Sequence, residues 1–302
     1  EQAKFVMGSQ ANVWTEYMRY PAKVEYQLFP RLSALSEVFW SPKESRSWAD
    51  FEPRLITQFK RYDLWGSNYS KAFFDISKEI KPDADKKGLS LSLSTKGKDG
   101  KLKYRMGGSA AEMDYKNPIA IKEKSKVSAS YYDKQGRLVD SMTLDLNINK
   151  ATGKPVTLKE EPSANLAGLG GFVLVNGILN ETGTRSDESN GFQSNVEAVI
   201  DLLVPQQISS VSVHALNSGG TTIYPPQSLS VFGSTDGINY TLLGKAEGPG
   251  EVKGMKTILK TEFGPQTTRY VKIAVEQLPL VPEGKKNAGQ KTWLYLDEVE
   301  ID

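Results

Sequence analysis

The stretch SLSVFGSTDGINYTLLG, residues 228–244, decides the fold class of the larger part of this chain. Apolar and polar side chains alternate on both sides of Asp236-Gly237, a dipeptide typical of a tight hairpin turn between two strands. Within residues 163–302, further strand-like runs follow at regular spacing: EAVIDLLV, SSVSVHAL, RYVKIAVEQ and WLYLDEVEID. Short strands at this spacing predict an eight-stranded sandwich of the jelly-roll type over residues 163–302.

Residues 76–160 show the same period of two. LSLSLSTKGKDGKLKYRM alternates around a Lys-Asp-Gly turn, and KVSASYYDKQGRLVDSMTLDL alternates around Gln135-Gly136. This pattern predicts a small all-β sandwich. EEPSAN, residues 160–165, has the composition of a linker and would separate the two β domains.

Residues 1–75 have a different texture, because they hold four of the five tryptophans and show helical spacing. VEYQLFPRLSALSEVFW predicts a helix with an apolar stripe, and Pro30 is expected in a first turn or at a break. The stripe consists of Leu28, Leu32, Leu35 and Phe39.

SWADFEPRLITQFKRYDLWG, residues 47–66, predicts a second helix. Ser47 is a candidate N-cap and Gly66 a candidate stop, with apolar positions at Phe51, Leu55 and Phe59. Together with the apolar run Phe5-Val6-Met7, residues 1–75 predict one strand, a loop and two helices. A buried parallel strand needs neighbours on both sides, so this zone is either part of a larger fold or an accessory layer on the sandwiches. The pattern alone leaves both open.

Composition excludes several classes of function. The chain has 38 basic and 36 acidic side chains and a net charge of +2, which gives no indication of a nucleic-acid partner. The absence of cysteine excludes disulfides, thiolate metal sites and a cysteine nucleophile. No run reaches the ~18 apolar residues of a transmembrane segment. The single histidine, His214, is expected to be a strand residue rather than part of a catalytic triad.

The N-terminal residues carry a family resemblance. FVMGSQANVWTEYMRYPAKVEYQLFPRLSALSEVFWS, then DFEPRL and YDLWGSNYS, resembles the C-terminal end of the catalytic barrel of glycoside hydrolase family 20, the β-N-acetylhexosaminidases. The resemblance covers residues 4–70 and rests on G-x-Q-A-x-x-W-T-E and on a Pro-Arg-Leu helix ending in Glu-Val-x-Trp. It implies that residues 1–75 are the last strand and helices of a (β/α)8 barrel. The missing N-terminal part of the same barrel would then be their partner.

The two β regions carry looser resemblances. Residues 163–302 resemble the discoidin-like (factor 5/8 type C, galactose-binding-like) modules of many bacterial enzymes of this family. Residues 76–160 resemble the small chitobiase-type C-terminal sandwich. The expected fold class is therefore a multi-domain chain, a barrel remnant followed by two all-β domains.

The resemblance implies roles for two residues, Trp14 and Glu16. Barrel enzymes place their chemistry at the C-terminal ends of the strands, where both would lie. The indole would form a wall of the pocket for a terminal N-acetylhexosamine, and the carboxylate would accept hydrogen bonds from sugar hydroxyls. The alternative is a core tryptophan and a surface glutamate.

No catalytic residue is assigned in this chain. The resemblance implies substrate-assisted retention without a cofactor, in which an Asp orients the substrate acetamide and an adjacent Glu is the general acid. That pair lies in a His-x-Gly-x-Asp-Glu context. The Asp-Glu pairs of this chain, Asp187-Glu188 and Asp297-Glu298, both lack the His and Gly. We expect Asp187-Glu188 to lie in a solvated loop and the chain by itself to be inactive.

The discoidin-like resemblance also implies a candidate structural Ca²⁺ site near Asn176 and Glu298. Asn176 stands where such modules often have an aspartate, so one ligand charge is missing. Tyr224 and Phe192 are candidate glycan contacts on loops, and the alternative for both is buried packing.

The predicted function is that of part of a retaining exo-β-N-acetylhexosaminidase. Its partners would be glycans with terminal β-linked N-acetylhexosamine. The resemblance to this enzyme family is the sole basis for expecting the protein in the bacterial envelope or outside the cell. The alternative function is a non-catalytic carbohydrate-binding or structural accessory module. Glycan binding that depends on Tyr224 would favour it.

Overall fold

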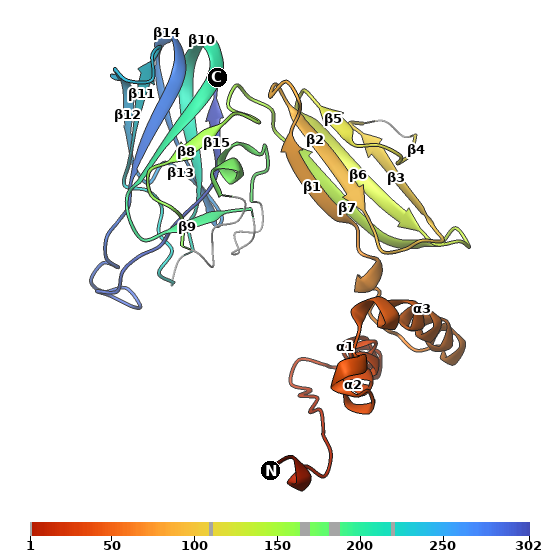
Figure 1. Ribbon diagram of the computed structural model, residues 1–302. Coiled ribbons are helices and arrows are strands. Elements are labelled where there is room, and N and C mark those ends of the chain that lie inside the picture. The colour runs from red at the N-terminus through yellow and green to blue at the C-terminus, as the bar shows by residue number, and fades with distance from the viewer. Residues whose placement is uncertain (1, 109–110, 164–169, 181–187, 219–220) are drawn as a thin grey trace. The chain divides into compact units, whose positions relative to one another are not determined.

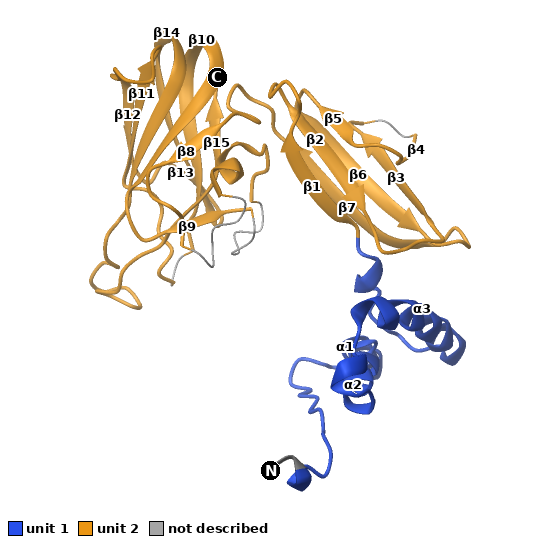
Figure 2. Cartoon of the chain, in the orientation of Figure 1, with its two compact units in different colours: residues 1–75 blue, residues 76–302 orange. Residues whose placement is uncertain are grey.

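The computed structural model describes residues 2–108, 111–163, 170–180, 188–218 and 221–302. The chain divides into two compact units, residues 1–75 and residues 76–302 (Figure 2). The first unit is helical and the second is built of strands (Figure 1). The predicted all-β character of residues 76–302 is therefore confirmed.

The predicted strand at Phe5-Val6-Met7 is not formed in this structure, because residues 2–75 contain no strand. Gln2–Phe5 form a short 3₁₀ helix (η1), and residues 6–15 have no regular secondary structure. A parallel strand obtains its backbone hydrogen bonds from neighbouring strands, and no segment of the described first unit supplies them. A barrel remnant is thus not seen in this unit.

The helix predicted over residues 24–40 is two helices. Helix α1 spans Pro21–Leu28 and α2 spans Arg31–Trp40, and Pro30 precedes the first turn of α2 as predicted. Neither helix buries a residue completely. The contact to the core of the unit is made by Phe29 and Ala34, so Leu32 and Phe39 of the predicted apolar stripe are 38% and 48% exposed.

Helix α3, Trp48–Trp65, follows the prediction closely. Ser47 caps it by accepting the N–H of Asp50, and Gly66 ends it with a left-handed φ of 68°. Its buried face carries the aromatic core of the unit, which consists of Phe51, Leu55, Phe59, Tyr62 and Tyr69. The remaining short 3₁₀ turns are η2 (Lys43–Ser45) and η3 (Ala72–Phe74).

The small sandwich has two antiparallel sheets. One has the order β1-β2-β5, with bounds Ser77–Pro82, Leu89–Ser94 and Ile119–Ile121. The other has the order β4-β3-β6-β7, with bounds Met113–Asp114, Lys101–Met106, Ser125–Tyr132 and Leu138–Leu146. The turn at Gln135-Gly136 joins the paired strands β6 and β7 as predicted. The Lys-Asp-Gly turn instead crosses between the sheets, because β2 and β3 do not pair.

The C-terminal sheet is organised by two 21-residue strands, β10 (Val196–Leu216) and β14 (Lys256–Glu276), which lie side by side (Figure 1). Their register is interrupted between Asp201 and Gln206 and between Ile208 and Ser210. The sequence runs EAVIDLLV and SSVSVHAL, predicted as separate strands, are therefore the two halves of β10. Because each long strand bends, it contributes to two layers.

One layer has the order β12-β11-β14-β10-β8, and the other has the order β13-β14-β10-β15-β9. The hairpin predicted at Asp236-Gly237 joins β11 and β12. The core between the layers is aliphatic and includes Val213, Ile273 and Val299, all fully buried. The bounds are β8 Val156–Leu158, β9 Asn190–Phe192, β11 Ser228–Ser234, β12 Thr241–Glu247, β13 Glu251–Lys253 and β15 Leu294–Ile301, and Gly170–Val175 form a 3₁₀ segment, η5.

The strand pairing does not agree with the domain boundary predicted at residues 160–163. Strand β8 lies inside the predicted 76–160 domain, yet Ala198, Val199 and Ile200 of β10 pair with it. The chain therefore enters the C-terminal sandwich before the linker-like EEPSAN, of which residues 164 and 165 lie outside the described residues.

Candidate functional site

Trp14 and Glu16 lie in the irregular segment between η1 and α1. Trp14 is 73% exposed, and Glu16 is exposed in a turn closed by the N–H of Met18 on the carbonyl oxygen of Thr15 at 2.9 Å. An exposed indole can stack on the apolar face of a sugar ring, and an exposed carboxylate can accept from two hydroxyls. Trp14 is therefore not a core residue of this unit, which was the alternative interpretation.

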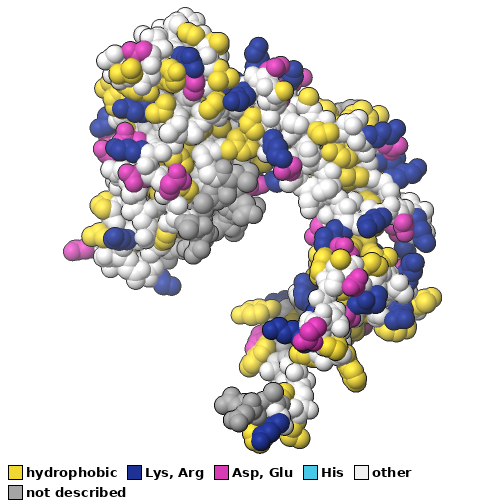
Figure 3. Space-filling view, viewed as in Figure 1, with side chains coloured by type: hydrophobic (Ala, Val, Ile, Leu, Met, Phe, Trp, Pro, Cys, Tyr) yellow, Lys and Arg dark blue, Asp and Glu magenta, His cyan; other side chains and the backbone are white. Residues whose placement is uncertain are grey.

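The surroundings of Trp14 are unusually apolar for a protein surface. Figure 3 shows hydrophobic side chains at the surface of the first unit. In the irregular segment and η1 these are Phe5, Val6, Met7, Val13, Tyr17 and Tyr20, of which Met7 and Tyr17 are 102% and 93% exposed. Exposed apolar side chains gathered in one segment are typical of a surface that binds another molecule or another part of the protein.

Tyr224 has a neighbour that sequence reasoning did not assign to a site. Its N–H donates to the carbonyl oxygen of Trp293 at 3.1 Å, and the N–H of Trp293 donates to that of Thr222 at 2.7 Å. Both aromatic side chains are half-buried. Trp293 packs against a buried cluster that includes Ile223, which is 6% exposed. The signal for Trp293 was its position at the start of the last strand-like run.

Phe192 is not a surface residue. It is 1% exposed, lies in β9 and belongs to the core of the C-terminal sandwich. The prediction of a glycan contact at Phe192 is therefore wrong, and buried packing is correct. Phe192 pairs with Leu294 of β15, which belongs to the same core.

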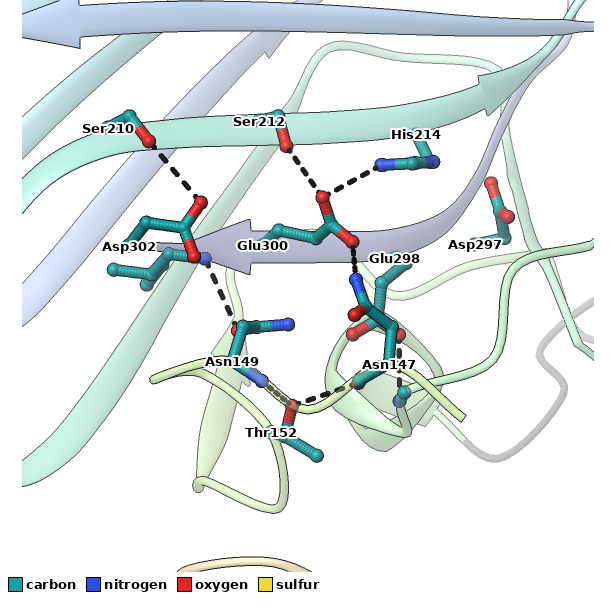
Figure 4. Close-up of polar contacts among 12 residues, drawn as sticks. Asn147, Asn149, Thr152, Ser210, Ser212, His214, Asp297, Glu298, Glu300 and Asp302 are labelled. Atoms are coloured by element: carbon teal, nitrogen blue, oxygen red, sulfur yellow. Dashed lines mark hydrogen bonds and ion pairs between the residues drawn. The ribbon is translucent and has the colours of Figure 1, made fainter. Parts of the chain in front are cut away.

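Asn176 and Glu298 accept hydrogen bonds from neighbouring backbone N–H groups, those of Ile178 and Gly177. The N–H of Gly177 donates to Glu298 Oε2 at 3.0 Å, while Asn176 Oδ1 accepts the N–H of Ile178 at 2.8 Å. Nearby, Asp297 Oδ2 accepts the N–H of Asn180 at 2.8 Å. Asn176, Asp297 and Glu298 are 3%, 2% and 0% exposed. The two acids thus fasten the segment after η5 to β15, whereas the Asn176 bond closes a turn within that segment (Figure 4 shows the two acids).

Burial dominates the electrostatics of the two acids. It raises the pKa of Asp297 to about 6, against the backbone N–H of Asn180, which favours the charged form. Burial, and next the charge of Asp297, raise the pKa of Glu298 well above its usual value. Glu298 Oε1 has no hydrogen-bond partner, and although Asn149 lowers this pKa slightly, its Nδ2 lies outside hydrogen-bonding geometry. Both acids therefore favour the neutral form more than exposed carboxyls do.

These residues do not fit a Ca²⁺ site. Ca²⁺ takes about six to eight oxygen ligands. The side-chain oxygens of Asn176 and Asp297 named above are already occupied by backbone N–H groups, and Glu298 Oε1 is the one orphaned oxygen of this set. Within the described ranges, no group of three or more His, Asp or Glu side chains could hold a metal ion. We derive no role for calcium from this arrangement.

His214 is a strand residue, as predicted. It lies in β10, is 4% exposed, and its Nε2 is 3.3 Å from Glu300 Oε2, within ion-pair distance but outside hydrogen-bonding geometry. The imidazole lowers the pKa of the Glu300 carboxyl. Of the other acidic pair, Asp187 lies outside the described residues, and Glu188 forms an ion pair with Lys78.

The described part of the chain contains no helix long and apolar enough to cross a membrane. Residues 1–43 match the family model described as glycosyl hydrolase family 20, catalytic domain. A β-hexosaminidase from Porphyromonas gingivalis is 39% identical over 69 residues, which is 23% of this chain and 9% of that protein. A β-N-acetylhexosaminidase from Cellulomonas fimi is 36% identical over 61 residues, 20% of this chain and 12% of that protein. The chain thus aligns with about a tenth of the length of these relatives.

Two solved structures align with parts of this chain. A chitosan-binding module of a chitosanase/glucanase from Paenibacillus is 17% identical, with a TM-score of 0.35, and the alignment covers 51% of this chain and 98% of that one. The C-terminal domain of a chitobiase from Bacteroides fragilis is 19% identical, with a TM-score of 0.24, over 36% of this chain and 62% of that one.

Proposed function

We propose that this chain is the C-terminal part of a retaining exo-β-N-acetylhexosaminidase. Residues 1–75 would complete the (β/α)8 catalytic barrel of that enzyme. The observation that carries the proposal is the family 20 match of residues 1–43, extended by 39% identity over 69 residues to a β-hexosaminidase. The parent enzyme would remove terminal N-acetylhexosamine from glycans and would be secreted or held in a bacterial envelope.

The exposed apolar segment supports this proposal. In a barrel, Phe5, Val6 and Met7 would form the last parallel strand and lie between two neighbours. In the first unit they are 70% exposed or more. Side chains that lack a partner here would be covered by the rest of the barrel. This accounts for an apolar run that forms no strand by itself.

Trp14 and Glu16 would then line the substrate pocket. The indole of Trp14 would pack on the apolar face of the terminal sugar, and Glu16 would accept hydrogen bonds from its hydroxyls. Neither residue would transfer a proton or attack the anomeric carbon. Substrate-assisted hydrolysis uses the substrate acetamide as nucleophile and needs no cofactor. The Asp-Glu pair that it requires, with its His and Gly, does not occur in these 302 residues.

The test is hydrolysis of a chromogenic N-acetyl-β-glucosaminide by the complete parent enzyme and by residues 1–302 alone. We expect activity only in the parent. In the parent, Trp14→Ala and Glu16→Gln should each lower kcat/KM by about 10²-fold or more, the loss of one pocket wall or one charge-assisted hydrogen bond near the transition state. Trp65→Ala is the matched control, because it removes an exposed tryptophan that lies outside residues 1–43 of the family match and has no assigned role in the pocket. Activity of residues 1–302 alone, or parent activity that is insensitive to both substitutions, would sink the proposal.

A second candidate function is glycan binding by the C-terminal sandwich. It is favoured by the paired loops that carry Tyr224 and Trp293, two half-buried aromatic residues adjacent through backbone bonds. Titration of the 302-residue chain with N-acetylglucosamine oligomers tests it. Tyr224→Ala and Trp293→Ala should each abolish binding, and Tyr240→Ala, which removes a ring that packs on Lys272, should not. Binding that survives both loop substitutions would exclude these loops as the glycan site.

A further inference from the structure

The segment 147–154 follows strand β7 directly, where a linker between two β domains would be expected. Its backbone is bonded to the C-terminal sandwich. The N–H of Asn147 donates to the carbonyl oxygen of Gly177 at 2.8 Å, that of Lys150 to Ile301 at 3.0 Å, and that of Gly153 to Val175 at 2.8 Å. Ala151, in the middle of the segment, is fully buried in the C-terminal core. Residues 151–154 are therefore buried, and residues 147–150 are half-buried.

Side chains of the same segment fasten it to β15. Asn149 Oδ1 accepts the N–H of Ile301 at 3.2 Å and that of Ala151 at 2.8 Å. Asn147 Nδ2 donates to the carboxylate of Glu300. Figure 4 shows these amides and Thr152 lying against the strands that carry Ser212 and Glu300. Opening the segment would break these hydrogen bonds at half-buried asparagines, so they favour the closed arrangement.

The segment also contacts the small sandwich on its other side. Lys154, which is 8% exposed, donates from Nζ to the carbonyl oxygen of Lys86 in the loop between β1 and β2. A Cβ on Gly153 would lie 2.7 Å from the carbonyl oxygen of Gly88 in the same loop. The close approach leaves no space for any side chain at position 153.

Two further contacts extend the junction. Leu146, the last residue of β7, forms an antiparallel bridge with Ile178, and both are buried. Leu89 of β2 is fully buried, and its Cδ1 would lie 3.2 Å from a Cβ on Gly177. Apolar burial therefore continues from the small sandwich through the junction into the C-terminal sandwich. Separating the two would expose this surface to water.

We propose that the segment 147–154 is a rigid joint, which makes the small sandwich and the C-terminal sandwich one body that moves and unfolds as a whole. Flexible linkers are solvated and polar, and domains joined by them reorient freely. The segment 147–154 is polar in sequence, but it is not solvated, because residues 151–154 are buried and its backbone is bonded to the C-terminal sandwich. A ligand bound by the C-terminal sandwich would consequently be held in a fixed orientation to the small sandwich. The inference does not depend on the proposed function.

Distance measurements between spin labels test the joint, and the absence of cysteine from the chain makes the labelling simple. The 302-residue chain would carry Lys134→Cys, in the exposed turn between β6 and β7, and Ile238→Cys, in the exposed turn between β11 and β12. A reference pair within the C-terminal sandwich, Ile238→Cys with Lys285→Cys, gives the width expected without domain motion. We expect equal widths for both pairs. A clearly broader distribution across the joint would overturn the proposal.

Variants of the joint provide the second measurement. Gly153→Ala should broaden the distribution across the joint, because it adds a Cβ against Gly88 at a φ of +73°. Gly284→Ala is the matched control, with a φ of +77° and nothing within 4 Å of the added atom, and should leave the width unchanged. Should Gly153→Ala not fold, Lys154→Ala removes the Lys86 contact with less strain and should also broaden it. Equal widths in the folded joint variant and in the control would show that segment 147–154 does not set the orientation.

Discussion

Arg269 holds Asp201 through two parallel hydrogen bonds, from Nε to Oδ1 at 2.8 Å and from Nη2 to Oδ2 at 2.9 Å. The pair joins β14 to β10 at the residue where the register of β10 is interrupted. The N–H of Leu203, whose φ is +72°, also donates to Asp201 Oδ1 at 2.8 Å. Asp201 thus fastens the bend that lets one strand serve two layers.

The first prediction concerns this pair. Asp201→Asn should lower the free energy of unfolding at pH 7 by about 1–2 kcal/mol, less than for a fully buried pair because Arg269 is partly exposed. Arg269 lowers the pKa of Asp201 in the folded protein. The carboxylate therefore stabilises the fold fully above its unfolded pKa of about 3.9, and the contribution is lost as pH falls through the folded pKa. Urea unfolding at pH 7 and at pH 3 measures both.

The control for this prediction is Glu262→Gln. Glu262 forms an ion pair with Lys260, and both side chains are largely solvated. We expect no measurable change in the free energy of unfolding, because solvent screens this pair. If the difference between wild type and Asp201→Asn were as large at pH 3 as at pH 7, the ion pair would not be its cause.

The second prediction concerns where the C-terminal sandwich begins. A fragment of residues 163–302 lacks β8 and the segment that covers Glu300, whereas residues 147–302 keep both. The shorter fragment should be less stable by more than about 2 kcal/mol, because the contact of Asn147 to the charged Glu300 alone is worth about 1.5–3 kcal/mol. Denaturant unfolding of the two fragments measures the difference. Equal midpoints and slopes would place the boundary at residue 163 after all.

Features that depend on residues close together in the sequence were predictable, and features that depend on distant contacts were not. Helix α3 was predictable with its cap Ser47 and its stop Gly66, because both act within a few residues. The hairpin at Asp236-Gly237 was predictable for the same reason. The pairing of β8 with β10 was not, because no local signal distinguishes a three-residue strand from a linker.

The candidate site divides in the same way. The motif identified Trp14 and the loop-like sequence identified Phe192. Neither signal could predict that Trp14 is exposed and Phe192 buried, because exposure depends on which parts of the fold pack against each residue. Trp293 was missed as a neighbour of Tyr224 because the contact joins segments about 70 residues apart along the chain. The predicted apolar stripe is not the face that contacts the core, because that contact is made by Phe29 and Ala34.

The third prediction concerns the core of the first unit. Phe59 is 3% exposed, and its ring lies 5.1 Å from the rings of Tyr69 and Phe74 and 5.5 Å from that of Phe73. Phe59→Ala should cost about 3–5 kcal/mol through lost burial and the cavity left behind. Near-ultraviolet circular dichroism during urea unfolding reports on this aromatic cluster. Leu64→Ala, at a position 85% exposed on the same helix, should change stability by no more than about 0.5 kcal/mol.

The last prediction concerns metal. Because Asn176 and Asp297 direct side-chain oxygens to backbone N–H groups, added Ca²⁺ and added chelator should leave the Tm of residues 1–302 unchanged. A Ca²⁺ ion at a hundred times its Kd would add about 2.7 kcal/mol, which shifts the Tm measurably. Differential scanning calorimetry with millimolar Ca²⁺, Mg²⁺ or chelator gives the answer. A rise in Tm with Ca²⁺ alone, abolished by Glu298→Gln, would show that the orphaned oxygen of Glu298 is a metal ligand. No response in any buffer would leave Glu298 as a structural residue that accepts the N–H of Gly177.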